Sequence, residues 1–295
     1  MAKLTDLPNE LLIQVAGFLP TGTLTKLSRT SRNLEKVADT ILYQHTRLPV
    51  SDGPDSTKWK DRIFFLTRTL ATRPDLAARL RALDVSMVYD WRQSSPVSYM
   101  DHKNAVDRIL STVHVGSQRA NQRWRKALYY GYTRAWLGLV LYMVPNLGRL
   151  TIRPFSDSHP GELHVDAADF SALFENPGLD LRSVPGLRSL KQLELYTTRT
   201  SQHWYNLPSL ERMRIGPEVY TKTDLKHNSS SKVTEIHTTQ KIWQLTGPQN
   251  DLSFLRGLVN LFPALRRLDI DFEDKPRYVD RVVSGWIWTR SGRHG

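Results

Sequence analysis

The first forty-odd residues place apolar side chains at helical spacing in three short runs. In the first run they recur every three or four positions, and Pro20 with Gly22 ends the run. Thr23 is a candidate N-cap for the second run, and Ser31 is a candidate N-cap for the third. The pattern therefore predicts three short helices.

A unit of this size buries too little apolar surface to be stable on its own. Its apolar residues are also too many for one small interior, since Leu7, Pro8, Leu11, Val15 and Phe18 cannot all point into it. We therefore expect part of this surface to contact another protein. The alternative is that the three helices pack as a cap on the remainder of the chain.

The order and spacing of these residues resemble the F-box motif. The matching residues are Leu4-x-x-Leu7-Pro8-x-Glu10-Leu11-Leu12, then Phe18-Leu19, then Leu27-Ser28-x-x-Ser31-Arg32-x-Leu34. The one departure, Val15 where the family more often has isoleucine, is conservative. The resemblance covers residues 4 to about 45.

The resemblance implies docking onto the Skp adaptor of a cullin–RING ubiquitin ligase, and through that adaptor onto a cullin. The side chains that it assigns to the adaptor contact are Leu7, Pro8, Leu11, Leu12, Val15, Phe18, Leu24, Leu27, Ser31 and Leu34. We take residues 1–48 as this domain.

A second pattern begins after residues 49–57, which read as a linker because they are rich in Pro, Gly, Ser and Asp. A short phrase of apolar residues, spaced first by three positions and then by two, recurs along the chain. Its copies begin at Leu80, Leu147, Leu190, Leu210, Val233 and Leu265. In each copy a turn leads into a strand whose alternate side chains point into a core, so neighbouring copies must stack.

This recurrence resembles leucine-rich repeats. It departs from them in its irregular intervals and in Thr198, Glu218 and Glu273, which stand where the repeat family has Asn. The expected fold class is α/β: a three-helix F-box, then an irregular leucine-rich-repeat-like solenoid of parallel strands with helices on the other face. We expect that body over residues 58–274, and an ordinary α/β domain is the alternative. Residues 275–295 are basic and hold no complete copy, so we expect a loosely ordered tail.

Polar residues alternate with the apolar ones along the repeat strands and should form the exposed face. Thr151, Gln192 and Asp271 belong to this face. The residues that we expect to contact a target protein are Arg149, Arg153, Glu194, Tyr196, Arg212, Arg214, Arg267 and Asp269.

The chain has 41 Lys and Arg against 29 Asp and Glu, a formal net charge of +12. No acidic residue occurs between Arg108 and Ser156. Such charge favours an acidic partner, although a solvated basic face is the common reading. The alternative function is a basic module that binds nucleic acid or acidic protein without a ligase role. It would use this stretch, where Arg119, Arg123, Trp124, Arg125, Lys126, Tyr129 and Tyr130 combine charge with stacking surfaces.

The chain has no cysteine, so it cannot carry a thiol nucleophile, a disulfide or a Cys-ligated zinc site. No catalytic motif is present, and we expect neither enzymatic activity nor a cofactor or metal. No apolar run is long enough to span a bilayer, which favours a cytoplasmic or nuclear protein with no membrane partner. The sequence therefore favours a non-catalytic ligase adaptor, a combination similar to fungal F-box adaptors, with an unknown and acidic protein target. Nucleic acid is the less favoured partner.

Overall fold

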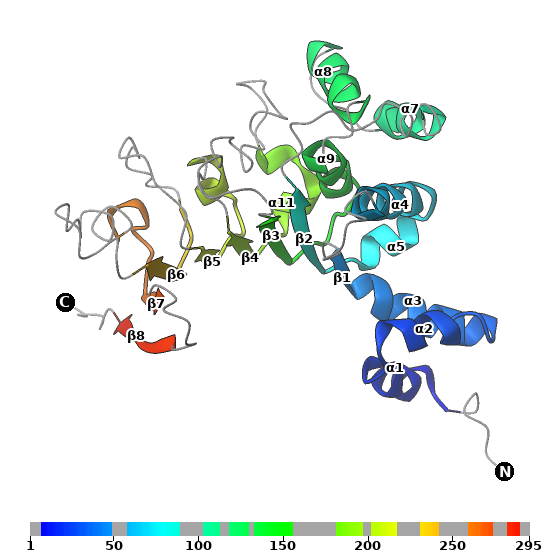
Figure 1. Cartoon of the computed structure of the whole chain (residues 1–295), viewed down its shortest axis with the longest axis horizontal. Coiled ribbons are helices and arrows are strands. Elements are labelled where there is room, and N and C mark those ends of the chain that lie inside the picture. The colour runs from blue at the N-terminus through cyan, green and yellow to red at the C-terminus, as the bar shows by residue number, and fades with distance from the viewer. Residues whose placement is uncertain are drawn as a thin grey trace.

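Three N-terminal helices stand at one end of an eight-stranded sheet, and further helices cover one face of that sheet (Figure 1). The computed structural model describes residues 7–48, 58–88, 103–112, 118–129, 133–155, 181–196, 202–216, 231–241, 259–273 and 282–289. The segment expected to be a linker, residues 49–57, lies outside this description. Among the described helices, none is long and apolar enough to cross a membrane.

The N-terminal helices are α1 (Asn9–Gly17), α2 (Thr21–Leu27) and α3 (Arg32–Gln44). The backbone N–H of Leu34 donates a 3.2 Å hydrogen bond to the Ser31 hydroxyl, so the expected cap of the third helix is present. The second helix begins at Thr21 and not after Thr23, because the Pro20 carbonyl accepts the first helical hydrogen bonds. The helices share a small core of Leu12, Ala16, Leu24, Leu34, Val37 and Ala38.

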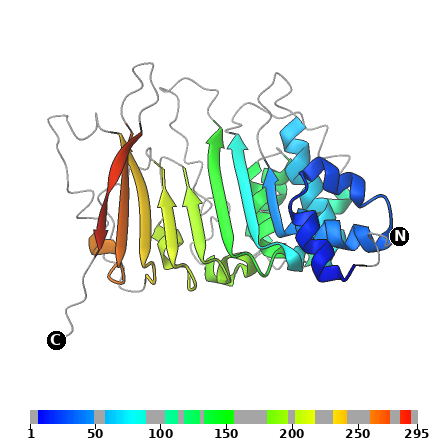
Figure 2. The same cartoon turned by 90° about the horizontal axis from the view of Figure 1, so that it is seen from below.

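The strands lie side by side in chain order (Figure 2). They are β1 (His45–Leu48), β2 (Ala82–Val88), β3 (Arg149–Phe155), β4 (Gln192–Leu195), β5 (Arg212–Ile215), β6 (Glu235–Lys241), β7 (Arg267–Glu273) and β8 (Val282–Thr289). Strands β1 to β7 are parallel, which confirms the expected parallel sheet in a mixed α/β fold, and β8 is antiparallel to β7.

The remaining helices are α4 (Lys58–Thr72), α5 (Pro74–Arg79), α7 (Lys103–Thr112), α8 (Gln118–Tyr129), α9 (Thr133–Met143) and α11 (Pro185–Arg188), with 3-10 turns η2 (Leu181–Ser183) and η3 (Gln202–Asn206). They lie on one side of the sheet, and Figure 2 looks onto the opposite side. The main core fills the space between helices and strands.

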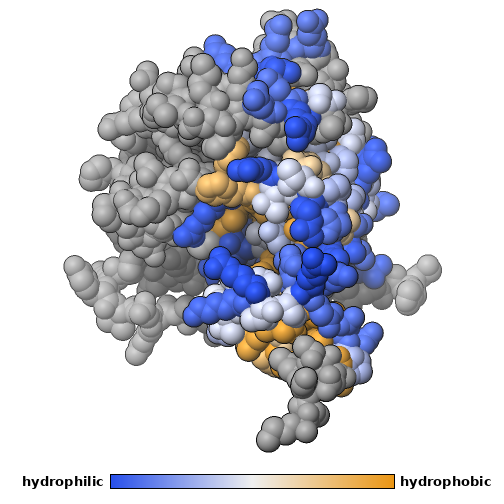
Figure 3. Space-filling view, turned by 90° about the vertical axis from the view of Figure 1, so that its right-hand side faces the viewer, coloured by the Kyte–Doolittle hydropathy of each residue, from blue (hydrophilic) through white to orange (hydrophobic). Residues whose placement is uncertain are grey.

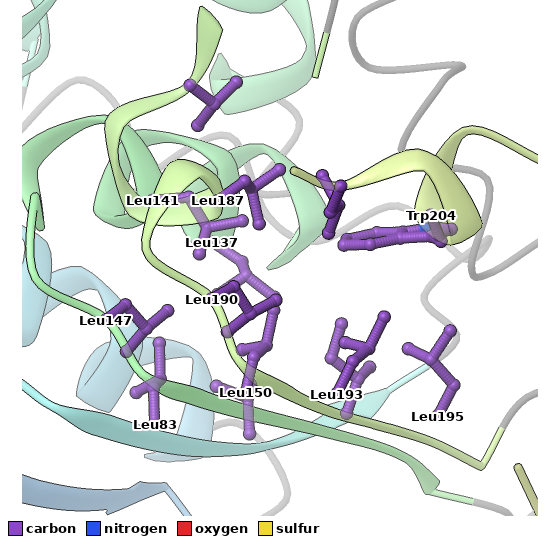
Figure 4. Packing of buried hydrophobic residues seen from close by; sticks show 14 of the residues in the cluster. Leu83, Leu137, Leu141, Leu147, Leu150, Leu187, Leu190, Leu193, Leu195 and Trp204 are labelled. Atoms are coloured by element: carbon purple, nitrogen blue, oxygen red, sulfur yellow. The ribbon is translucent and has the colours of Figure 1, made fainter. Parts of the chain in front are cut away.

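Leucines dominate this core (Figure 4). Leu83, Leu150 and Leu193 occupy equivalent positions on β2, β3 and β4, and all three are buried. The end of α9 and the start of α11 approach so closely that a Cβ on Gly186 would lie 2.6 Å from the Leu141 carbonyl oxygen. No larger residue fits there without a backbone shift.

Each copy of the apolar phrase enters the sheet through the same backbone contact. The carbonyl of Arg81 accepts hydrogen bonds from the N–H groups of Gly148 and Arg149, and the carbonyl of Gly148 accepts from Lys191 and Gln192. The carbonyls of Lys191, Glu211 and Thr234 repeat the pattern toward β5, β6 and β7. These shared hydrogen bonds satisfy backbone groups at the starts of β3 to β7 and place consecutive copies in register.

The N-terminal helices are joined directly to the sheet, because α3 runs into β1 and β1 pairs with β2. An Arg79 guanidinium nitrogen donates a 2.9 Å hydrogen bond to the Thr40 hydroxyl, and an Arg73 nitrogen lies 3.8 Å from an Asp39 carboxylate oxygen. Burial raises the pKa of the Asp39 carboxyl, and the charge of Arg73 opposes that shift. Polar contacts between α3 and residues 73–79 thus stabilise the connection between the N-terminal helices and the sheet.

The C-terminal segment differs from the expected loose tail. Residues 282–289 form β8, which pairs with β7 over Arg267 to Glu273 with a register shift between Ile270 and Phe272. Residues 274–281 and 290–295 lie outside the described residues. Residues 282–289 form an ordered strand because β7 would otherwise end the sheet with unpaired backbone groups. Strand β8 supplies partners for those groups.

Candidate functional site

One face of α1 is apolar and uncovered. Leu7, Leu11, Val15 and Phe18 recur at helical spacing along this segment and are 37%, 45%, 49% and 88% exposed. Pro8, beside them, is also exposed. Figure 3 shows an apolar area at the lower end of the molecule, where Figure 1 places α1.

Fully burying a Val, Leu or Phe side chain contributes about 1.5–3 kcal/mol relative to leaving it in water. Covering this face with a partner would therefore contribute several kcal/mol before the costs of association. Only two other large apolar side chains of the described residues, Phe65 and Val259, are comparably exposed. The concentration of such residues on α1 is typical of a docking surface.

The other residues that the F-box resemblance assigned to the adaptor contact lie inward. Leu12, Leu24 and Leu34 are at most 7% exposed and form the small core, while Leu27 packs at its edge. Ser31 is engaged as the N-cap of α3. The side chains of these residues have little exposed area for contact with a partner. They contribute to the proposed docking surface indirectly, because they form the core against which α1 packs.

Comparison with protein families agrees with this geometry. The family model described as F-box-like matches residues 4–49. Residues 4–49 are an F-box-like domain. Such domains generally bind Skp1-type adaptors, and the proteins that carry them are typically non-catalytic adaptors of ubiquitin ligases. No curated protein matches the chain.

The second candidate surface is the sheet face opposite the helices. Its central row runs through paired positions of β2 to β7: Asp84, Thr151, Glu194, Arg214, His237 and Asp269. The preceding row carries Arg149, Gln192, Arg212, Glu235 and Arg267. All eight residues that we expected to contact a target belong to these rows or to the next one, which contains Arg153 and Tyr196.

Two members of this face are buried, contrary to the expectation of exposure. Thr151 is 2% exposed and Glu194 is 4% exposed. The Glu194 carboxylate accepts hydrogen bonds from Arg149 at 2.7 Å and from Gln192 at 3.0 Å. The buried Glu194 carboxylate therefore has two hydrogen-bond donors, one from the adjacent strand β3 and one from its own strand β4.

The far end of the face is acidic and internally paired. A ring nitrogen of His237 lies 2.7 Å from an Asp271 carboxylate oxygen, and Arg267 lies 3.0 Å from Asp269. The neighbouring Asp269 carboxylate raises the pKa of Arg267 further. His237 gave no signal in the sequence, because only the strand pairing places it opposite β7.

The centre of the face is a cluster of Arg153, Tyr196 and Arg214 from three adjacent strands. The guanidinium carbons of Arg153 and Arg214 lie 5.6 Å and 5.8 Å from the centre of the Tyr196 ring, within cation–π range. Gly216 makes room for the ring, since a Cβ there would lie 2.9 Å from the Tyr196 Cα. The sequence pointed to all but Gly216, whose contribution depends on a packing distance.

In the alternative function the basic stretch binds nucleic acid through exposed aromatic and basic side chains, and the structure does not show that arrangement for its described residues. Trp124 is fully buried and packs edge-on against Tyr142, with ring centres 5.5 Å apart, so it cannot stack on a base. Arg125 is paired with Asp107. The side chains of Arg119, Arg123, Tyr129 and Tyr130 lie outside the described residues. Among the residues that are described, no group of three metal-ligating side chains occurs.

Proposed function

We propose that this protein is a substrate-recognition adaptor of a cullin–RING ubiquitin ligase. Its F-box-like domain docks on a Skp-type adaptor, and its sheet domain presents a target protein for ubiquitylation. The observation that carries the proposal is the F-box-like match at residues 4–49, in which Leu11, Val15 and Phe18 form an uncovered apolar face. The chain acts without chemistry of its own and has no cysteine to accept ubiquitin.

The body is proposed to be a degenerate leucine-rich-repeat-like solenoid. Support comes from the recurring backbone contact at each strand start and from the buried first residue of every copy. We assign residues 1–48 to the F-box, 49–57 to a linker and 58–274 to the body. Strand β1, the last element of the F-box segment, adds the first strand to the sheet, and β8 closes the other edge.

The joint between the two parts suits this function. A ligase adaptor must hold its target at a defined place relative to the ubiquitin-loaded enzyme, because positioning is its whole contribution. The continuity of α3 with β1 and the Arg79–Thr40 hydrogen bond resist hinge motion there. The target surface is proposed to be the sheet face, which the described helices leave uncovered (Figure 2).

The proposal is tested by capture of a purified Skp-type adaptor on the immobilised full chain. Val15→Asp should reduce the affinity at least tenfold, because it places a carboxylate in the proposed apolar contact. Phe65→Asp is the matched control, since Phe65 is similarly exposed but lies on α4. Equal capture by the two variants, or no capture by the unaltered chain, would contradict the proposal.

A further inference from the structure

The Arg153–Tyr196–Arg214 cluster contains donors that the described protein leaves unused. The Nε atoms of both arginines are buried and have no hydrogen-bond partner among the residues that the structure describes. Arg153 also contacts Asp84 at 3.2 Å, and Asp84 is shared with Arg47 at 3.5 Å. Arg214 has no hydrogen-bond or ion-pair partner among the described residues, and its guanidinium makes a cation–π contact with the Tyr196 ring.

This contrast is informative because most other charged side chains of the face are paired. Arg149 is engaged by Glu194, Arg267 by Asp269, and Asp271 by His237. Among the described residues Arg212 and Glu235 also lack an ion pair, but both are exposed, whereas Arg214 is partly buried. A buried polar group without a partner costs stability, so its presence calls for an explanation. A guanidinium held against an aromatic ring is also pre-organised, and little rotamer freedom remains to be lost when it binds an anion.

The charge on the face is unevenly distributed. Over β1 to β5 the charged outward side chains that are described comprise five arginines and two carboxylates: Arg47, Arg149, Arg153, Arg212, Arg214, Asp84 and Glu194. Over β6 and β7 they include one arginine and three carboxylates: Arg267, Glu235, Asp269 and Asp271. The basic half therefore complements an acidic partner segment, and the cluster lies in this half, over β3 to β5.

We infer that the Arg153–Tyr196–Arg214 cluster binds a carboxylate side chain of an acidic segment in the target protein. The inference rests on the proposed function, because it assigns a chemical class to the target contact. Arg214 forms the principal ion pair through its guanidinium, whose planar N–H groups match the two oxygens of a carboxylate. Arg153 adds charge from β3, and Tyr196 holds both guanidiniums in place. Arg214 is the one partly buried guanidinium of this face that has no ion pair among the described residues, whereas a phosphoryl group is usually bound by several arginines together.

The test uses the full chain immobilised on beads and four pools of random twelve-residue peptides. The pools differ in one fixed central residue, which is Glu, Gln, Lys or phosphoserine. The Glu pool should be retained at least fivefold more than the Gln pool, and the Lys pool least. Equal retention of the Glu and Gln pools would overturn the inference, and stronger retention of the phosphoserine pool would overturn the choice of a carboxylate.

Four variants localise the effect. Arg214→Met should abolish the preference for Glu. Arg68→Met removes the same charge from an exposed position on α4 and should preserve the preference. Tyr196→Phe keeps the ring and should retain most of the preference, whereas Tyr196→Ala should lose it. Equal losses in the Arg214 and Arg68 variants would show unspecific charge attraction and overturn the assignment. Thermal unfolding of each variant verifies that it is folded.

The same variants separate this inference from the proposed function. Arg214→Met should capture the Skp-type adaptor as well as the unaltered chain does, because Arg214 lies on β5, away from the α1 face. Loss of the Glu preference with normal adaptor capture supports the inference. Normal adaptor capture without any Glu preference contradicts the inference alone, and Glu preference without adaptor capture contradicts the proposed function alone.

Discussion

The N-terminal helices and the sheet differ in how far their apolar side chains are buried. In β2 to β5 the inward residues on each strand, such as Leu83, Leu150, Leu193 and Met213, are at most 2% exposed. In α1, Leu12 and Ala16 are buried, but their helical neighbours Leu11 and Val15 are about half exposed. Regular spacing of apolar residues therefore gives a buried core in the sheet, but in α1 it leaves part of the apolar side chains exposed.

The difference follows from what each region can stack against. Each of the inner strands β2 to β5 has a neighbour on both sides and helices above it, so its inward residues lose nearly all contact with water. The three N-terminal helices enclose only a small core and cannot cover both sides of α1. An apolar pattern consequently specifies burial only where the fold supplies a covering layer, and elsewhere it indicates a partner.

The largest expected effect tests this contrast directly. Leu193→Asp or Leu268→Asp should unfold the sheet domain, because each places a carboxylate among fully packed apolar side chains, a cost of several kcal/mol. Val15→Asp should leave the melting temperature nearly unchanged, because its site already faces water. Thermal unfolding followed by circular dichroism measures both, and similar losses for the core and surface variants would refute the comparison.

A second prediction concerns the surface itself. Leu7→Ala combined with Pro8→Ala should weaken binding of a Skp-type adaptor at least tenfold, since truncating an interface anchor commonly costs about 1–2 kcal/mol. Stability should be preserved because both residues are exposed. Calorimetric titration of the full chain with the adaptor gives the affinity, and undiminished binding would exclude these residues from the contact.

The end of the sheet supplies a third prediction. Removing residues 282–295 deletes β8 and leaves the outer edge of β7 unpaired. Backbone amides of β7 should then exchange with solvent at least tenfold faster, while those of β3 should be unaffected because they lie four strands away. Hydrogen exchange by mass spectrometry measures this, and unchanged protection of β7 would show that β8 contributes nothing to the edge.

A smaller effect is expected where the sheet faces water. Arg214→Ala should change the free energy of unfolding by less than about 0.5 kcal/mol, because the residue has no ion pair among the described residues and leaves the core intact. A chemical denaturation curve measures the change. A loss as large as that of Leu193→Asp would mean that the inward and outward faces had been exchanged.

The smallest expected effect lies at the joint between the two regions. Burial raises the pKa of the Asp39 carboxyl in the folded state, so stability from its protonated form is lost as the pH rises through that pKa. Asp39→Asn lacks this titration and should be slightly more stable than the unaltered chain near pH 7. The difference should shrink as the pH falls below the normal range of the carboxyl. Melting temperatures from pH 3.5 to 7.5 measure it, and a difference independent of pH would disprove the assignment.

The local elements and their phase could be predicted from the sequence. Helical spacing predicted α1 to α3, the Ser31 cap was visible as a residue type, and alternation identified Leu193 as inward and Arg214 as outward. The F-box resemblance was likewise carried by a short contiguous segment. All of these features depend on residues close together in the chain, where propensity and periodicity act directly.

The tertiary structure decided everything that depends on which segments become neighbours. Leu11 and Leu12 are equivalent in the motif, and only the packing of α2 and α3 buries one and exposes the other. Glu194 is buried because Arg149 lies beside it across a strand pair, and Tyr196 meets two arginines because β3, β4 and β5 are in register. The pairing of β8 was missed for the same reason. Contacts across strands are set by register and long-range packing, which no short stretch of sequence contains.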